Sequence, residues 1–149
     1  MFHIDTVADE RTLSLGLEVR RRVFVEEQGV APQLESDGLD ASARHVVAWL
    51  GDQVIGTARL VIEDRVGRIG RMAVLREHRG QGVGSRLLSA LLDVARREGL
   101  EGVYVHAQLT AVGFYGRFGF VPEGEEFLEA GIPHIKMVAS FDSLEEATS

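Results

Sequence analysis

The sequence predicts a mixed α/β fold, in which an antiparallel N-terminal meander is followed by a parallel strand pair joined by a crossover helix. Three apolar runs, residues 45–50, 54–62 and 66–75, are separated by short polar turns, and such turns join antiparallel neighbours. An amphipathic stretch, residues 82–98, then leads to another apolar run at 103–107. A strand, a helix and a strand in this order form a right-handed crossover, so the strands at 66–75 and 103–107 should run parallel.

The segment before the meander predicts one strand and one helix. Residues 2–7 alternate between apolar and polar side chains, which is typical of a short strand. Asp9 is a suitable cap for a following helix, whose apolar residues recur near a helical period as far as Phe24. Residues 29–42 contain Gly, Pro, Ser and Asp, so we expect a loop or a broken short helix there.

The helix from Gly82 to about Glu98 has the most regular pattern in the chain. Its apolar stripe comprises Val83, Leu87, Leu91 and either Val94 or Ala95, and is widened by Leu88 and Leu92, which is the arrangement of a helix packed on a core. Gly99 follows directly, and a glycine in the left-handed conformation commonly ends a helix.

The remaining elements are shorter. Residues 111–117 predict a short helix and residues 118–122 the entry to a strand. The acidic segment 123–131 is expected to be a loop, residues 134–141 a closing strand, and residues 142–149 a frayed polar tail.

Length and composition indicate one globular domain, residues 1–149, with 45% hydrophobic and 26% charged residues. No apolar run is long enough to span a membrane and no signal peptide opens the chain, so we expect a cytoplasmic protein without a membrane partner. The net charge of −7 argues against a nucleic-acid partner and is compatible with a cationic substrate such as an amine.

Several reaction classes are disfavoured by what the sequence lacks. There is no cysteine, which excludes disulfides, thiolate metal sites and cysteine nucleophiles. The five histidines show no metal-binding spacing such as H-E-x-x-H, so no metal is expected. The G-x-S-x-G motif of serine hydrolases is also absent.

A glycine-rich turn lies between the strand at 66–75 and the following helix. Its residues are Arg79, Gly80, Gln81, Gly82, Val83 and Gly84. Glycines let backbone N–H groups approach a bound group closely, and a helix start adds free N–H donors and the positive end of the helix dipole. The turn is therefore a candidate anion site, most naturally for phosphate, although a connection without any ligand has the same pattern.

A second cluster lies beyond the helix, at Gln108, Phe114, Tyr115 and the Phe118-Gly119-Phe120 run. Phenylalanines usually form core clusters, and this cluster fits that interpretation too. Tyr115 differs from them, because a buried tyrosine hydroxyl needs a polar partner.

Together the two motifs resemble the GCN5-related N-acetyltransferases (GNAT). The sequence R-G-Q-G-V-G is similar to the family's phosphate-binding turn, with Arg79, Gly82 and Gly84 in the defining places, and A-V-G-F-Y-G-R-F-G-F is similar to its second signature. V-F-V-E-E-Q, D-G-L-D and G-I-P-H-I-K-M resemble the ElaA-like branch of this superfamily.

The resemblance implies transfer of an acyl group from acyl-CoA, usually acetyl-CoA, to a primary amine. Backbone N–H groups of the turn would hold the pyrophosphate, one strand would bind the pantetheine arm, and the parallel strands would splay to leave a slot for it. Gln108 stands where many members have Asn. The residues implied in cofactor binding are Met72, Ala73, Val74, Arg79, Gly80, Gln81, Gly82, Val83, Gly84, Ser85, Gln108 and Phe114.

Amide formation needs a proton acceptor, an oxyanion donor and a proton for the leaving thiolate. A backbone N–H of residues 72–74 is the expected oxyanion donor. By family position Tyr115 would protonate the thiolate, unless its hydroxyl only positions the sulfur. The candidate bases are Glu26, Glu27, His106 and His134.

Each candidate base has an alternative interpretation. Apolar neighbours could raise the pKa of Glu27, or Glu27 could simply be a solvated helix end. His106 points either into the slot or into the core, and His134 could line the acceptor side. Similarly, the arginines at 76, 79, 86 and 117 could meet CoA phosphates, and the glutamates of 123–129 could attract a cationic acceptor, or both groups could be ordinary solvated surface.

The function that we expect is N-acetyl transfer from acetyl-CoA to a small-molecule or peptide amine, by direct attack in a ternary complex, since no cysteine can carry the acyl group. The alternatives are a non-catalytic acyl-CoA-binding or sensing module, and an acyltransferase with another donor or a non-amine acceptor. The resemblance also allows a homodimer that pairs through C-terminal strands.

Overall fold

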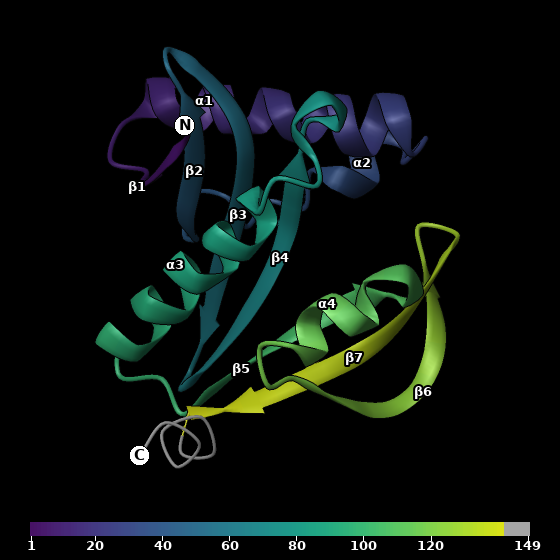
Figure 1. Ribbon diagram of the computed structural model, residues 1–149. Coiled ribbons are helices and arrows are strands. Elements are labelled where there is room, and N and C mark those ends of the chain that lie inside the picture. Colours follow the sequence, from purple (N-terminus) through teal and green to yellow (C-terminus); the bar gives the residue numbers. More distant parts are fainter. Residues whose placement is uncertain (142–149) are drawn as a thin grey trace.

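The computed structural model of the protein describes residues 1–141. Its centre is a seven-stranded sheet in the order β1-β2-β3-β4-β5-β7-β6 (Figure 1). The strands are β1 (His3–Thr6), β2 (Arg44–Leu50), β3 (Gln53–Glu63), β4 (Val66–Val74), β5 (Gly102–Gln108), β6 (Val121–Glu129) and β7 (Ile132–Ser140).

The predicted mixed fold is confirmed. The strands β2, β3 and β4 form an antiparallel meander, and β4 and β5 run parallel. The helical segments are α1 (Glu10–Arg20), the π-helix η1 (Arg21–Glu27), α2 (Pro32–Glu35), η2 (Arg76–His78), α3 (Val83–Arg97), η3 (Leu109–Ala111) and α4 (Val112–Gly116).

Two helices cover opposite faces of the meander. The carboxylate of Asp9 caps α1 by accepting a hydrogen bond from the Thr12 N–H at 2.7 Å. Gly16 of α1 packs against Thr57 of β3, whereas the neighbouring Gly56 packs against the side chains of α3. The apolar stripe of α3 is buried as predicted, and Gly99 adopts a φ of 76° just after the helix ends. Among the described residues, none of the helices has the length and apolarity needed to cross a membrane.

The strands β4 and β5 pair over only part of their length. Residues Val66–Ile69 pair with Gly102–Val105, and the pairing ends there. Beyond this point the two strands diverge, and Figure 1 shows the sheet opening into two arms. The predicted splaying of the parallel pair is thus confirmed.

The strand β4 also contains a bulge just beyond the paired region. Thr57 pairs with Ala73 and Arg59 pairs with Gly70, so two residues of β4 lie opposite one residue of β3. One of these two residues is Arg71, which has a φ of 47°. This is the left-handed region, in which a non-glycine residue is strained.

The prediction that residues 123–131 form a loop is wrong, because most of them belong to the edge strand β6. This strand pairs with β7, which lies between β5 and β6. Most of its side chains are exposed, so burial imposes no apolar alternation on it, and acidic residues are common on exposed sheet edges. The predicted tail at 142–149 lies outside the described residues.

Candidate active site

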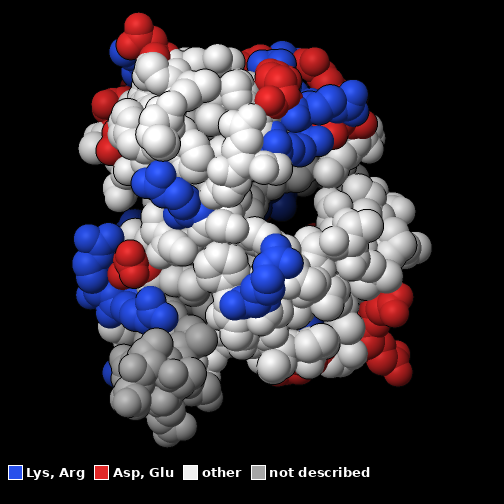
Figure 2. Space-filling model, viewed as in Figure 1, with Lys and Arg blue, Asp and Glu red and all other residues white. Residues whose placement is uncertain are grey.

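A cavity of about 830 Å³ occupies the space where β4 and β5 diverge. Figure 2 shows it as a dark hollow between the two arms of the molecule. Thirteen of the fifteen predicted site residues line it, and Glu27 and Gln81 do not. The thirteen are Met72, Ala73, Val74, Arg79, Gly80, Gly82, Val83, Gly84, Ser85, His106, Gln108, Phe114 and Tyr115.

The glycine-rich turn forms one end of this cavity. Gly80 and Gly82 have φ values of 78° and 84°, which glycine adopts without strain. Gly82 is the N-cap of α3, and no side chain caps the helix there. The first N–H groups of α3 are therefore available to an anionic group at the cavity, with the helix dipole adding to the attraction.

The side chain of Arg79 serves a structural purpose in this turn. Its Nε donates to the Val74 carbonyl at 2.9 Å, and its two Nη groups donate to Glu27 at 2.6 and 2.7 Å. The guanidinium thus ties the turn to the end of β4 and to η1, and its hydrogen bonds are directed at protein groups.

The same contact corrects the expectation for Glu27. The hydrogen bond from Arg79 lowers the pKa of Glu27, with smaller contributions from the charges of Arg79 and Arg76. Burial acts to raise the pKa of Glu27, but the net shift is downward, and this carboxylate lies outside the cavity. Glu26 is also absent from the cavity lining, and it pairs with Arg21.

The bulge in β4 is held in place by the side chain of Arg71. Its Nε and Nη2 donate to the carbonyl of Glu35 at 3.2 and 3.1 Å, and Nη2 also lies 3.2 Å from Asp37 Oδ2. These contacts fasten the strained residue to the last residue of α2 and to the segment that follows it. Consequently Met72, the next residue, has a fixed place in the cavity wall.

The segment after α2 is in turn fixed by a cluster of paired charges. Arg20, which is only 2% exposed, donates to Glu35 and to Asp40, each at 2.6 Å. Arg59 donates to Asp37 and Asp40. The hydrogen bond from Arg59 holds the pKa of Asp37 well below its usual range. The region 29–42 is thus a loop with one short helix, tied to α1, β3 and the β4 bulge.

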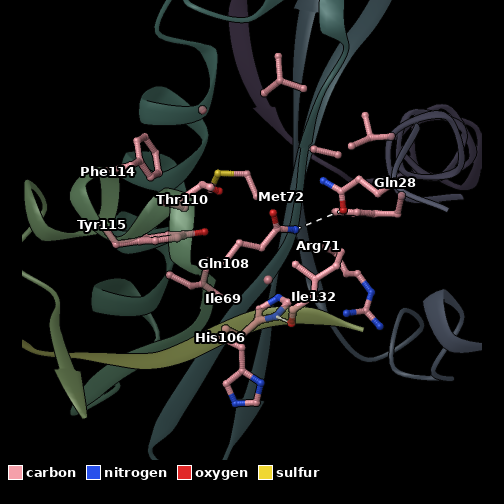
Figure 3. Close-up of a pocket in the computed structure, with 18 of the residues that line it drawn as sticks. Gln28, Ile69, Arg71, Met72, His106, Gln108, Thr110, Phe114, Tyr115 and Ile132 are labelled. Carbon is pink, nitrogen blue, oxygen red and sulfur yellow. Dashed lines mark hydrogen bonds between the residues drawn. The ribbon is translucent and has the colours of Figure 1, made fainter. Parts of the chain in front are cut away.

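Tyr115 lies in α4 and is largely buried against aromatic rings. Its ring meets Phe114 and Phe120 edge-on, with centroids 5.1 and 5.7 Å away. Figure 3 shows its hydroxyl directed into the cavity. Burial raises the pKa of Tyr115 to about 12, so the phenol stays protonated at neutral pH.

A hydrogen bond crosses the cavity near the end of η1. Gln108 Nε2 donates to Gln28 Oε1 at 3.2 Å (Figure 3). The two residues belong to different arms of the molecule, and Gln28 was not anticipated from the sequence. The amide of Gln108 therefore reaches across the slot in this structure.

Four polar residues from four strands converge at the other end of the cavity. His106 Nδ1 lies 2.9 Å from Glu129 Oε1 and 3.0 Å from Arg68 Nη2. His134 Nε2 lies 3.6 Å from Glu129 Oε2. All four residues line the cavity, so His106 points into the slot and not into the core. We call Arg68, His106, Glu129 and His134 the histidine cluster.

The charge of Glu129 is maintained by this cluster. Burial is the largest single influence and acts to raise its pKa, but the hydrogen bond from His106 and the charges of His106, Arg68 and His134 together lower the pKa. Sequence reasoning named Glu129 only as one of the acidic residues that could attract a cationic acceptor, and it missed both Arg68 and the contact of Glu129 with His106, because the pairing of β6 with β7 carries no local signal. Among residues 1–141 no group of three or more His, Asp or Glu could hold a metal ion.

Comparison with known proteins gives this cavity a context. Residues 8–141 match the family model described as an acetyltransferase (GNAT) domain. The chain belongs to the GNAT family. YjcF of Bacillus subtilis, described as an uncharacterized N-acetyltransferase, is 38% identical to this GNAT protein over 131 residues, which cover 87% of this chain and 94% of YjcF.

Two further relatives refine the placement. ElaA of Escherichia coli is 36% identical over 126 residues, covering 81% of this chain and 82% of ElaA. Its crystal structure matches the present GNAT fold with a TM-score of 0.84, over 94% of this chain and all of that one. An acyl-CoA N-acyltransferase from Pseudomonas aeruginosa is 33% identical, also with a TM-score of 0.84, over 94% and 100% of the two chains. The predicted family and ElaA-like branch are confirmed, and family membership supports N-acyltransferase activity in general.

Proposed function

We propose that this protein is an acetyl-CoA-dependent N-acetyltransferase that transfers the acetyl group directly to a primary amine in a ternary complex. The observation that carries the proposal is the cavity between β4 and β5. It joins a glycine-rich helix start at one end, a protonated tyrosine at its side and a histidine cluster at the other end. Direct transfer follows because the chain has no cysteine to carry the acyl group.

The donor would lie along the slot. The N–H groups of residues 79–85 would bind the pyrophosphate, and residues 72–74 of β4 would hydrogen-bond the pantetheine arm as an added strand would. Phe114 lies 3.7 Å from the position that a Cβ on Gly84 would take, so it would pack beside the arm as it leaves the turn. Gln108 would contact the arm from the β5 side.

The surface arginines differ in how they could help. Arg117 lines the cavity and lies over the Phe114 ring at 5.9 Å, which makes it the best placed to meet a CoA phosphate. Arg76 lies 3.7 Å from Glu27, and Arg86 donates to the Phe2 carbonyl at 3.3 Å. We therefore assign phosphate binding mainly to the backbone of the turn, with Arg117 as the supporting cation.

The reaction needs three groups around the thioester carbon. The amine nitrogen forms the new C–N bond while the C–S bond breaks. A backbone N–H just beyond the bulge would stabilise the oxyanion. Tyr115 would donate its hydroxyl proton to the leaving sulfur. Burial makes the phenol a weak acid, but a thiolate forming in the same desolvated place becomes more basic as well.

His106 is our choice for the general base. It lines the cavity, whereas Glu27 lies outside it and is held by Arg79. The pKa of Glu27 is lowered as well, which weakens it as a proton acceptor. Of the sequence candidates, His106 and His134 therefore remain on the acceptor side, and the proposed acceptors are small-molecule or peptide amines.

The test measures release of the CoA thiol from acetyl-CoA with a panel of amines: polyamines, amino acids and lysine-containing peptides. We expect amine-dependent release, with acetyl-CoA preferred over longer acyl donors. Tyr115→Phe should lower turnover while CoA binding, measured by calorimetry, is unchanged. CoA binding without release for any amine would contradict catalysis, and a preference for long-chain donors would contradict the acetyl assignment.

A further inference from the structure

We infer that Glu129 is a positioning residue, which holds His106 in the tautomer whose Nε2 can accept a proton from the acceptor amine. This inference rests on the proposed N-acetyl transfer, in which His106 is the base. It assigns a part in the reaction to a residue of the edge strand β6, and to Arg68 as the group that competes for the same nitrogen.

The histidine cluster leaves His106 with two exclusive hydrogen-bonding choices. Its Nδ1 lies 2.9 Å from Glu129 Oε1 and 3.0 Å from Arg68 Nη2. A carboxylate only accepts hydrogen bonds and a guanidinium only donates them. Nδ1 must therefore carry a proton to bond Glu129 and must lack one to bond Arg68.

Counting the hydrogen bonds favours the pair with Glu129. Arg68 Nη2 also lies 3.4 Å from Glu129 Oε1. When Nδ1 is protonated, both His106 and Arg68 donate to the carboxylate and every group has a partner. When Nδ1 is bare, Glu129 keeps only the longer bond from Arg68. The first arrangement leaves Nε2 of His106 unprotonated, as a general base requires.

Two more rings, those of His134 and Phe127, lie beside this contact. His134 Nδ1 lies 2.6 Å from the Ile132 carbonyl, so it must donate there, and its Nε2 faces Glu129 at 3.6 Å. The Phe127 ring lies between the two histidines, edge-on to His106 at 5.0 Å and stacked on His134 at 5.9 Å.

Two other groups face His106 from β5 and β7. Tyr104 lies 5.9 Å from its ring, and Lys136 is its partner across the strand pair. Lys136 Nζ is directed over the Tyr104 ring at 4.8 Å and lies 3.5 Å from Glu123. Neither group therefore competes with Glu129 for Nδ1.

The proton balance of the step is simple. As the amine nitrogen attacks, one N–H proton moves to His106 Nε2, and the imidazolium keeps its Nδ1–H on Glu129. The sulfur receives the Tyr115 proton. Solvent then removes the proton from Nε2 and restores the phenol, so the net change is one amide and one CoA thiol.

The experiment combines NMR with kinetics on the full-length enzyme. Proton–nitrogen correlation spectra of the ¹⁵N-histidine-labelled protein report which ring nitrogen carries the proton, and His106→Asn identifies the signal. We expect the Nδ1–H tautomer in the wild type and the Nε2–H tautomer in Glu129→Gln, because the amide can donate to Nδ1.

In the same variant we expect kcat to fall about 10- to 100-fold, within the range of general-base effects, with the KM for acetyl-CoA unchanged. Glu125→Gln is the matched control, since it makes the same change at an exposed position of the same strand, and it should behave as the wild type.

The outcomes separate the two claims. An active wild type whose tautomer or kcat is unchanged in Glu129→Gln overturns the positioning role and leaves acetyl transfer intact. A wild type that acetylates no amine overturns the proposed function instead.

Discussion

Arg79 and Glu27 form a two-pronged ion pair, with both Nη groups of the arginine bonded to the two carboxylate oxygens at 2.6 and 2.7 Å. The pair joins the glycine-rich turn to the end of η1, 52 residues earlier in the chain. It gives a structural role to Glu27, which the sequence left open as either a general base or a solvated helix end.

Glu27→Gln therefore tests whether this carboxylate supports the turn or performs chemistry. We expect the KM for acetyl-CoA to rise several-fold, because Arg79 loses its ionic partner and the turn loosens, while kcat changes by less than about threefold. Steady-state kinetics with Glu26→Gln as the control would show this. A fall in kcat of about 100-fold with an unchanged KM would restore Glu27 as the base.

Gly82→Ala tests the backbone of the anion site. Its φ of 84° costs a non-glycine residue about 1–2 kcal/mol, which would distort the start of α3 and weaken CoA binding about tenfold. Gly99→Ala is a matched control, because Gly99 has a φ of 76° and lies at the other end of the same helix. Calorimetry should show weaker binding only for Gly82→Ala, and thermal unfolding should show a similar loss of stability in both.

Asp37→Asn tests the charged cluster that anchors the bulge. Because Arg59 lowers the pKa of Asp37 in the folded state, the carboxylate stabilises the fold above its unfolded pKa of about 3.9 and loses this effect as the pH falls. We expect the variant to be about 2–4 kcal/mol less stable at neutral pH, with the difference shrinking below about pH 4. Urea unfolding across this range measures it, and Asp52→Asn in the exposed β2–β3 turn is the control. A pH-independent difference would contradict the assignment.

Tyr115 should remain protonated far into the alkaline range. Its pKa is raised to about 12, against about 10 in an unfolded chain, so the folded state binds this proton more tightly. Stability should consequently fall as the pH rises from about 10 to about 12. Ultraviolet titration should show a phenolate signal near pH 12 that Tyr115→Phe removes. An alkaline limb in the pH–rate profile near 10 that Tyr115→Phe abolishes would contradict this.

The parts of the site that local sequence determines could be predicted. The turn around Gly82 and the helix after it follow from glycine placement and apolar period, and the parallel order of β4 and β5 follows from the crossover. The bulge at Arg71 and the partners of Glu27 and His106 depend on contacts between segments far apart in the chain. No periodicity reports which arginine reaches which carboxylate, and β6 resembles a loop because solvent covers most of its side chains.

The short pairing of Val66–Ile69 with Gly102–Val105 also has a mechanical consequence. Within residues 1–141 it is the only strand pairing that connects the β1–β4 arm to the β5–β7–β6 arm. The two arms can therefore rotate relative to each other about this pairing, as about a hinge. Met72 and the bulge belong to the β1–β4 arm, whereas Tyr115, Gln108 and the ring of His106 belong to the β5–β7–β6 arm. A small rotation at this pairing would change the gap between the two arms by a larger amount, because the groups proposed to react lie beyond it. The distance between the proposed oxyanion donor and the proposed proton-transferring groups is therefore set by how the two halves of one sheet meet.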